Sequence, residues 1–597
     1  MQLLRSSRSW VDTSAVALGL IGLLAPIGCG GDANQDVVGD SVRSDATGSD
    51  MVASDAVGSD VVGGDVRGMD TVGMDVVGVD VVRTDAVDRP IPTDVPVADV
   101  PGSDVVVVGP RTAVTQFQFD LQRTGANRTE TSLTVAALRA GRFGRDTAFA
   151  PTFDAQIYAQ PLYLPMLTTR GVTRDVLFVF TLNNTIYALD AASGAQLWNL
   201  NLGAPVPFGA QSCGNIRPTI GIVGTPVIDR ATNTMYAVAF NSVGGVKTFN
   251  LSAVDLTTGA NRAGFPRALN PTAAGGLTLD TNATGERGAL TFVNGRVYIP
   301  FGGLYGDCGL YHGWVLGIDP MTAAAPVAFA TPGRGSGIWA VAGMSADGTG
   351  HLFTATGNGF TAGSQGEYVV RLGTAGAGPT FVNATTEYFT PSNRLALDAG
   401  DVDIGSVAPI VLPDHPGSST PHLLFQSGKA GVGYLINRDN LGGTGTGTGT
   451  VREGVYSASL FGSGVYGASG AWSNGTDVYV FVPGRGTRAA PCTGTGGVMA
   501  LRLALAAGAS TFQVAWCSAG FGNPSPPAIS SNGNNDAILW VAGGTSFRAY
   551  NVADGMEIYN AAGADALPAV RQWTPIVVAD GRVFVNTGDT IAMYRLR

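Results

Sequence analysis

The stretch Val176-Leu-Phe-Val-Phe-Thr-Leu-Asn-Asn-Thr-Ile-Tyr-Ala-Leu-Asp-Ala-Ala-Ser-Gly-Ala-Gln-Leu-Trp198 decides the fold. Two apolar runs enclose the polar turn at Asn183 and Asn184, and a Ser-Gly turn then leads into a third run that carries Trp198. Apolar runs of strand length, separated by Asn, Asp and Gly, are typical of antiparallel hairpins. The stretch is therefore predicted to form consecutive antiparallel strands.

Weaker copies of this pattern return along the chain, at Leu251–Gly259, Val315–Asp319 and Phe547–Gly555. A hairpin unit that repeats about every 40 to 50 residues predicts the blades of a β-propeller. The composition agrees, because 85 glycines and only 13% charged residues suit an all-β protein with many turns.

We predict an all-β, eight-bladed propeller of four-stranded antiparallel blades over residues 111–597. Seven blades are the alternative, if residues 404–517 are divided too finely. The predicted blade cores span residues 157–203, 224–262, 287–331, 338–389, 404–450, 465–517, 526–561 and 573–597. The last core lacks an outer strand, and Phe143–Asp154 has the composition of one. We expect that segment to complete the eighth blade and close the ring.

Residues 30–110 differ sharply from the rest of the chain. They hold sixteen aspartates and four arginines, a net charge of −12, and an Asp stands at every fifth position from Asp40 to Asp85. Such a segment has little to bury and its charges repel, which predicts a disordered tether. A calcium-binding repeat and a pentapeptide β-helix fit this spacing less well. The remaining chain is nearly neutral, so no nucleic-acid partner is implied.

The N-terminus is typical of an export signal. Arg5 and Arg8 precede the apolar run Ala15–Leu24, and small residues lead into Cys29. The run Ala25-Pro-Ile-Gly-Cys29 resembles a bacterial lipoprotein processing site, which implies a signal peptide over residues 1–29, a lipid anchor at Cys29 and a place in the cell envelope as an outer-membrane lipoprotein, on its periplasmic or surface face. A secreted protein is the alternative.

Four further cysteines, Cys213, Cys308, Cys492 and Cys517, favour disulfides in an exported protein. Spacing alone allows three pairings. Cys492 and Cys517 bracket what resembles one hairpin, so we pair them.

Several motifs together resemble the exported bacterial proteins with pyrroloquinoline-quinone-type propeller repeats. The resemblance covers residues 120–597 and is carried by Arg123-Thr-Gly-Ala-Asn127, Gln156-Ile-Tyr-Ala-Gln-Pro-Leu-Tyr163, Ile220-Gly-Ile-Val-Gly-Thr-Pro-Val-Ile-Asp229, Tyr311-His-Gly-Trp314, Thr354-Ala-Thr-Gly-Asn-Gly359 and Leu435-Ile-Asn-Arg-Asp-Asn440. It also pairs Cys213 with Cys308.

The same resemblance implies a site on the propeller axis. In the related dehydrogenases a quinone lies on a tryptophan floor beside Ca²⁺, and the matching positions here are Trp339 for the floor, Asn358 for a calcium ligand and Lys429 for a quinone contact. Asp403, with Asp401 nearby, matches the catalytic base. If such a site survives, these residues should converge on one face of the central channel.

Two departures argue against quinone chemistry. Leu304 stands where the family has a metal-binding Glu, and Leu offers a hard cation no oxygen. No two cysteines are adjacent, so the lid disulfide of the related enzymes cannot form. The four histidines also lack metal-ligand spacing. We therefore expect no metal and no cofactor, with pyrroloquinoline quinone and calcium as the alternative.

Three classes of function remain. The first is an envelope-tethered module that binds a small molecule, a glycan or a partner protein, or that serves as a scaffold. The second is a quinoprotein-type oxidoreductase, or another enzyme such as a lyase, that uses the propeller axis. The third is a purely structural spacer with a folded head. Fold analogy cannot separate them, because propellers carry all three.

Overall fold

The computed structural model describes residues 111–376, 378–446 and 453–597. The predicted signal segment, the lipid attachment at Cys29 and the predicted tether over residues 30–110 lie outside the described residues. Within the described ranges, no helix is long and apolar enough to cross a membrane.

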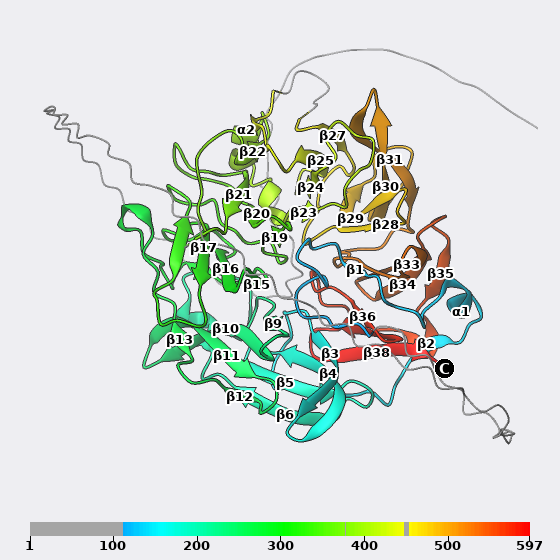
Figure 1. Cartoon of the computed structure of the whole chain (residues 1–597), viewed down its shortest axis with the longest axis horizontal. Coiled ribbons are helices and arrows are strands. Elements are labelled where there is room, and N and C mark those ends of the chain that lie inside the picture. The colour runs from blue at the N-terminus through cyan, green and yellow to red at the C-terminus, as the bar shows by residue number, and fades with distance from the viewer. Residues whose placement is uncertain (1–110, 377, 447–452) are drawn as a thin grey trace, which may run out of the picture. The chain divides into compact units, whose positions relative to one another are not determined.

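The described residues form an eight-bladed β-propeller, whose small antiparallel sheets follow one another around a ring (Figure 1). In most blades the strands pair in chain order, as in the sheet β3-β4-β5-β6. Eight blades are thus confirmed, and the seven-bladed alternative is wrong.

The first four blades occupy residues 162–390. Blade one contains β3 (Leu162–Thr169), β4 (Val172–Phe180), β5 (Thr185–Asp190) and β6 (Gln196–Asn201). Blade two contains β9 (Val227–Asp229), β10 (Thr234–Val243), β11 (Val246–Asp255), β12 (Ala260–Asn261) and β13 (Arg267–Ala268). Blade three contains β14 (Thr284–Gly285), β15 (Thr291–Val293), β16 (Arg296–Gly303), β17 (Trp314–Ile318) and β18 (Val327–Ala330). Blade four contains β19 (Ser345–Ala346), β20 (His351–Ala355), β21 (Val369–Gly373) and β22 (Tyr388–Thr390).

The last four blades complete the ring. Blade five contains β23 (Ile410–Val411), β24 (Leu423–Ser427), β25 (Val432–Asn437) and β27 (Tyr456–Ser459). Blade six contains β28 (Gly470–Ser473), β29 (Val478–Thr487), β30 (Thr495–Ala506) and β31 (Ala509–Cys517). Blade seven contains β32 (Ala528–Asn532), β33 (Asn535–Gly543), β34 (Ser546–Asn551) and β35 (Glu557–Asn560). Blade eight contains β36 (Val577–Ala579), β37 (Arg582–Asn586), β38 (Ile591–Leu596) and β2 (Phe143–Arg145).

Short elements lie between or beside the blades. They are β1 (Ala126–Asn127), β7 (Val206–Pro207), β8 (Thr219–Ile220), β26 (Gly443–Thr444), α1 (Val135–Arg139), α2 (Arg394–Ala399) and the single turns of 3-10 helix at Phe208–Ala210, Ala274–Gly276, Ile404–Ser406 and Gly563–Asp565.

Blade five differs from the prediction, which ended it at residue 450. Its outer strand is β27, and β26, from the Gly-Thr repeat that begins at Gly443, pairs in parallel with β22 of blade four instead. The sequence of β27 is Tyr-Ser-Ala-Ser, which is short and has none of the large aliphatic side chains that mark most of the other strands.

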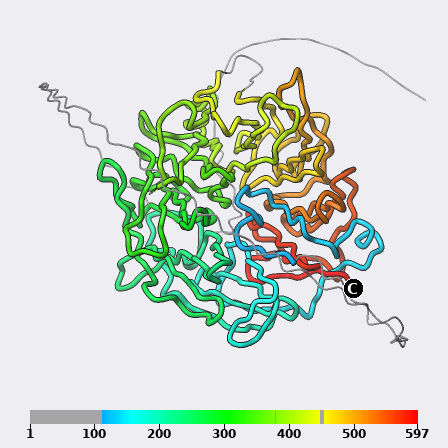
Figure 2. Tube along the Cα trace, viewed as in Figure 1, coloured from blue at the N-terminus to red at the C-terminus, as the bar shows by residue number. Residues whose placement is uncertain are grey.

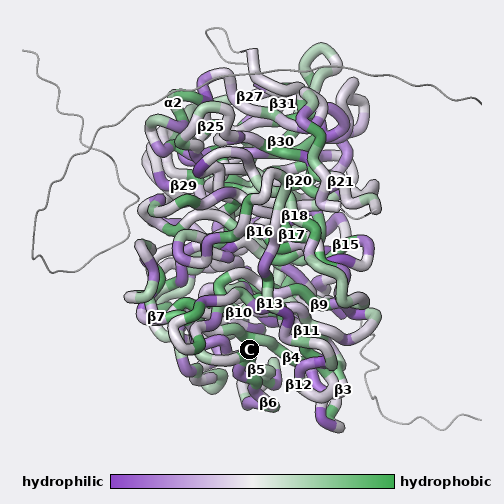
Figure 3. The backbone as a smooth tube through the Cα atoms, turned by 90° about the vertical axis from the view of Figure 1, so that its left-hand side faces the viewer, coloured by the Kyte–Doolittle hydropathy of each residue, from purple (hydrophilic) through white to green (hydrophobic). Residues whose placement is uncertain are grey.

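Apolar side chains between neighbouring blades form the core. Trp198 is 2% exposed, its ring lies 5.8 Å from that of Phe178, and its indole nitrogen donates a hydrogen bond to Thr169. Gly259 of blade two packs directly on the indole, where a Cβ would lie 2.8 Å from a ring carbon. In Figure 3, hydrophobic residues follow strands such as β17 and β30.

The ring closes through β2, as predicted. Phe143 pairs with Leu596 and Arg145 with Tyr594 across the β2–β38 ladder, and β2 and β38 lie side by side in Figure 1. Only residues 143–145 of the predicted closing segment form a strand. Because the two ends of the propeller domain share one sheet, the ring has no open seam.

The segment that precedes the ring-closing strand, residues 112–130, runs into the middle of the ring (Figure 2). We call it the N-terminal plug. Inner strands of six blades bond to its backbone, through Tyr163–Val114, Ile228–Thr115, Ala346–Leu121, Val411–Gln122, Ala471–Thr124 and Ile529–Gly125. Side chains add contacts to blades three and eight, from Arg123 to Leu290 and from Asn127 to Val578. One segment therefore holds all eight blades.

Two buried side chains anchor the plug. Phe117, 2% exposed, fills the axis within a cluster of small residues from blades three to six, namely Ala289, Ala340, Ala342, Ala408 and Ala468. Arg123 is fully buried, and its guanidinium donates to the carbonyls of Phe117, Met344 and Leu290 at 2.9–3.0 Å. Burial lowers the pKa of Arg123 to about 10, which leaves it charged at neutral pH.

Both predicted disulfides are present, Cys213–Cys308 and Cys492–Cys517. The first joins the segment before blade two to the β16–β17 connection of blade three, and the second closes blade six. Cysteine pairs of this kind favour an oxidising, extracytoplasmic compartment.

Candidate functional site at the axis mouth

The loops that precede the inner strands gather at one end of the axis, because equivalent parts of a repeated unit lie at equivalent places around a ring. We call this end the axis mouth. Trp339 precedes β19, Asp403 precedes β23, and Lys429 stands in the turn between β24 and β25. Asn358 follows β20.

The four residues singled out from the sequence meet at the mouth. The Lys429 Nζ lies 2.7 Å from the Asp403 Oδ2 and 5.5 Å from the centroid of the Trp339 ring. The backbone N–H of Asn358 donates to the Asp403 Oδ1 at 2.8 Å. Blades four and five thus bring an aromatic ring, a cation and a carboxylate together.

Asp403 and Lys429 are already engaged with each other. Asp403 is 2% exposed and both of its carboxylate oxygens have partners. Lys429 also bonds the carboxylate of Asp401 at 2.7 Å and the Asp401 carbonyl at 3.0 Å. Removing the partners of a buried cation costs free energy, so this network serves first to hold the loops in place. It leaves little charge on Lys429 for a ligand.

Glycines let the loops approach this closely. A Cβ on Gly357 would lie 2.7 Å from the indole nitrogen of Trp339, and one on Gly405 would lie 2.5 Å from the backbone nitrogen of Gly357. A side chain at either position would push the Trp339 and Asp403 loops apart.

Glu367 is a member of this cluster that the sequence did not reveal. It is fully buried, its Oε2 accepts from the backbone N–H of Ile404 at 2.5 Å, and its Oε1 accepts no hydrogen bond from any described residue. Burial, together with the negative charge of Asp403, raises its pKa well above the usual value. The sequence gives only one indication of this role, which is a single carboxylate just before the apolar strand β21.

A second group of side chains crosses the mouth. The guanidinium carbon of Arg287, which precedes β15 in blade three, lies 5.8 Å from the ring centroid of Trp339 and 5.5 Å from that of Trp573. Trp573 precedes β36 in blade eight, on the opposite side of the ring from blade four. The space between the two indoles therefore holds a guanidinium. The contacts continue outward, because Trp573 stacks on Tyr466 and the Arg485 guanidinium lies 4.8 Å from the Tyr466 ring.

These residues do not fit a calcium-bound quinone. The Arg287 guanidinium carbon lies 5.8 Å from the centroid of the Trp339 ring, the surface on which the quinone of the related enzymes would rest. By the sequence resemblance, Leu304 stands in place of the metal-binding Glu, and its side chain supplies no oxygen. In the described part of the chain, no cluster of three His, Cys, Asp or Glu side chains could hold a metal ion. The lid disulfide is also missing, since the cysteines pair elsewhere.

Comparison with known proteins identifies the fold of this chain but not a family. No protein family and no curated protein matches the sequence. Among solved structures, the quinohemoprotein alcohol dehydrogenase from Comamonas testosteroni has a TM-score of 0.56 at 14% identity, over 83% of this chain and 82% of that one.

Two further structures give the same result. The quinohemoprotein alcohol dehydrogenase ADHIIG from Pseudomonas putida HK5 has a TM-score of 0.54 at 14% identity, over 81% of this chain and 80% of that one. A europium-containing methanol dehydrogenase has a TM-score of 0.50 at 13% identity, over 79% and 89%. The described structure thus shares the quinoprotein propeller fold, and identities this low show the fold alone.

Proposed function

We propose that this chain is an extracytoplasmic, membrane-tethered propeller that binds a planar anionic ligand, or such a group on a partner protein, at the axis mouth. It uses no quinone. The observation that carries this proposal is Arg287, whose guanidinium lies between Trp339 and Trp573 in the space that a planar cofactor would need.

The chemistry of the mouth supports an anion. Beside the Lys429 network, Arg287 and Arg485 place two guanidinium groups among aromatic rings. A planar carboxylate can accept two parallel hydrogen bonds from a guanidinium and stack on a neighbouring ring. Convergent polar groups among aromatic side chains are typical of small-ligand sites.

An oxidoreductase at the same place is the second candidate. It is favoured by the fold and by the convergence of Trp339, Asn358, Asp403 and Lys429. It would require Asp403 to give up its present partners before it could accept a proton.

A spectroscopic titration separates the two candidates. Purified protein is titrated with pyrroloquinoline quinone, with and without Ca²⁺, and with benzene-1,3,5-tricarboxylate, while tryptophan fluorescence and visible absorption are followed. We expect saturable quenching by the tricarboxylate that Ca²⁺ does not change, and a clear weakening in Arg485→Ala. Arg334→Ala is the matched control, because its guanidinium also covers a ring, Phe360 at 4.3 Å, away from this set of contacts.

If the protein is an oxidoreductase, the same titration should give the opposite result. A calcium-dependent quinone absorption band, with turnover of an alcohol in the presence of an artificial electron acceptor, would overturn the binding proposal. Equal quenching in the wild type and in Arg485→Ala would show that the anion binds elsewhere.

The anchoring is proposed from the N-terminal sequence. Cys29 would carry the lipid and residues 30–110 would form the tether, with an outer-membrane lipoprotein favoured over a secreted protein. Metabolic labelling with a radioactive fatty acid should mark the wild type and fail to mark Cys29→Ser. Limited proteolysis should leave a stable fragment that begins near residues 105–120. A labelled Cys29→Ser protein, or a protected N-terminal segment, would contradict this arrangement.

A further inference from the structure

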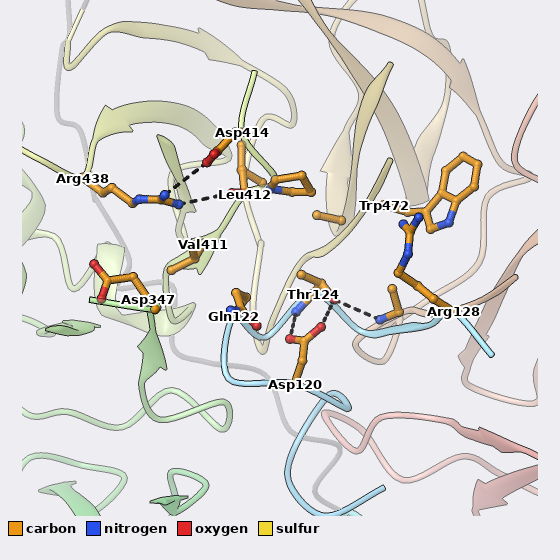
Figure 4. Close-up of a pocket in the computed structure, with 14 residues that line it drawn as sticks. Asp120, Gln122, Thr124, Arg128, Asp347, Val411, Leu412, Asp414, Arg438 and Trp472 are labelled. Carbon is orange, nitrogen blue, oxygen red and sulfur yellow. Dashed lines mark hydrogen bonds and ion pairs between the residues drawn. The ribbon is translucent and has the colours of Figure 1, made fainter. Parts of the chain in front are cut away.

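A polar cavity lies where the N-terminal plug crosses the inner strands of blades four, five and six. Its volume is about 330 Å³ (Figure 4). The plug supplies one side, from Asp120 to Arg128, and the ends of the inner strands supply the other, at Asp347, Val411 and Trp472. Asp347 follows β19 and Leu412 follows β23, whereas Trp339 and Asp403 precede these same strands. The cavity therefore lies at the opposite ends of the strands from the axis mouth.

On the blade side, the charged groups that line the cavity already have hydrogen-bond partners. Arg438 donates to the Asp414 Oδ1 at 3.1 Å. Asp347 accepts from the backbone N–H groups of Thr349 and His351, and its Oδ2 lies 3.2 Å from the His351 Nδ1. Burial raises the pKa of Asp347, but these hydrogen bonds outweigh it and leave the pKa below its usual value.

On the plug side, the charged groups form hydrogen bonds to neutral partners. Asp120 bonds the backbone N–H and the hydroxyl of Thr124, and burial raises its pKa, which favours the neutral acid. Arg128 donates to the Ser473 carbonyl at 2.8 Å and to Asn534 at 2.5 Å. Because carboxylates and guanidinium groups both line the wall, an ionic ligand of either sign would meet a like charge there, whereas a neutral ligand would not.

One polar group on the wall is uncommitted. The Gln122 backbone carbonyl accepts from Val411, but its carboxamide forms no hydrogen bond to any described residue. The carboxamide offers two donors and an acceptor to whatever fills the cavity. In Figure 4 it lies between Asp347 and Thr124, at the plug side of the space.

The rest of the wall is apolar. Apolar side chains lie beside the charged groups, from Val411, Leu412, Pro413 and Ala471. Trp472, which is 5% exposed, adds its indole ring. Its ring nitrogen donates to Ser531 at 3.0 Å, so the ring is fixed in place.

We propose that this cavity binds a short neutral carbohydrate. A sugar hydroxyl both donates and accepts, so it can bond carboxylates, the Arg438 fork and the Gln122 amide without leaving a buried charge unpaired. The C–H face of the sugar would pack on Pro413, Leu412 and Ala471. A volume near 330 Å³ holds one or two sugar units. This site is independent of the anion site at the axis mouth, and each proposal can fail without the other.

Isothermal titration calorimetry on the full chain tests the proposal with named probes. Maltose, cellobiose and N,N′-diacetylchitobiose represent neutral sugars, and glucuronate and glucose 1-phosphate represent anionic ones. We expect saturable binding of at least one neutral disaccharide and weaker or no binding of the anions. Gln122→Ala should weaken that binding by roughly fivefold, since a neutral hydrogen bond contributes on that order. Its thermal melting should be unchanged, because the carboxamide has no partner in the protein.

Gln513→Ala is the matched control, an exposed glutamine on β31 that does not line the cavity. It should bind as the wild type does. The protein is then passed over a resin of the polysaccharide that contains the bound sugar. If the resin retains the protein, the site binds polysaccharide chains. If the disaccharide binds but the resin does not retain the protein, the site binds free oligosaccharides. Failure of all three disaccharides to bind, tighter binding of an anionic sugar, or equal losses in Gln122→Ala and Gln513→Ala would overturn the proposal.

Discussion

The two ends of the propeller axis are filled by different kinds of structure. At the mouth, side chains from separate blades meet, with Arg287 between two indoles and Lys429 between two carboxylates. At the other end the chain itself fills the axis, and backbone hydrogen bonds join the plug to inner strands around the ring. Side chains can rotate away to admit a ligand, but the plug cannot leave the axis without breaking its hydrogen bonds to one blade after another. The mouth is therefore the end suited to exchange, and the plug is part of the fold.

The largest effect should come from opening the ring. Deletion of Ile591–Arg597 removes β38, the strand that pairs with both β37 and β2. Blade eight would lose two ladders at once, and we expect the truncated chain to show no cooperative unfolding transition by circular dichroism. Deletion of Arg597 alone is the control and should change little. A truncated protein that melts like the wild type would show that the plug, without the closing strand, holds the ring.

The next effect should come from the plug. Arg123→Ala leaves the carbonyls of Phe117, Met344 and Leu290 buried without their donor. Each such group costs free energy, so we expect a loss of at least about 3 kcal/mol in the free energy of unfolding, measured by urea titration. Arg128→Ala removes an exposed arginine from the same segment and should cost far less. Equal losses would mean that the contacts of Arg123 are not what fixes the plug.

The fold was predictable because its signal is local and repeated. The hairpin at Val176–Trp198 states the blade pattern within 23 residues, and β2 was identified because blade eight lacked a strand. The plug was not predicted, although the Arg123 motif was noted. Its residues pair one at a time with strands of different blades, which produces no periodicity in the sequence.

The candidate site was predictable only in part, and for a related reason. Trp339, Asn358, Asp403 and Lys429 were found because they match motifs of a known family, and the structure brings them together. Glu367 and Arg287 stand in no such motif. Their roles depend on which loops of the ring face each other, and that is set by the packing of whole blades.

A smaller effect should separate two carboxyl groups, the buried Glu367 and the partly exposed Glu387, by pH. The pKa of Glu367 is raised by burial and by Asp403, whereas the pKa of Glu387 is lowered by its hydrogen bonds to Arg371. Above the ordinary carboxyl pKa, the unfolded chain releases the Glu367 proton while the folded chain keeps it, so this group lowers stability as pH rises. Glu367→Gln should remove that decline and gain stability relative to the wild type from pH 5 to pH 8.

Glu387→Gln is the matched control with the opposite sign. Its charged form is favoured in the folded state, so its contribution is present above the ordinary pKa and is lost as pH falls. The variant should therefore be less stable than the wild type near neutral pH and approach it in acid. Melting temperatures across this pH range would decide the matter, and parallel curves for the two variants would refute the assignment of Glu367 as a neutral acid.

The smallest effect on stability should come from the mouth itself. Arg287→Ala removes a guanidinium from two indole rings, and each cation–π contact of this kind contributes about 0.5–1 kcal/mol. We expect a loss well below that of Arg123→Ala, together with a change in tryptophan emission as Trp339 and Trp573 meet solvent. Affinity for benzene-1,3,5-tricarboxylate should fall in the same variant, because the ligand loses a guanidinium that both indoles hold in place. If Arg287→Ala unfolds the protein as readily as Arg123→Ala does, the mouth is structural as well, and the proposal of an anion site there must be abandoned.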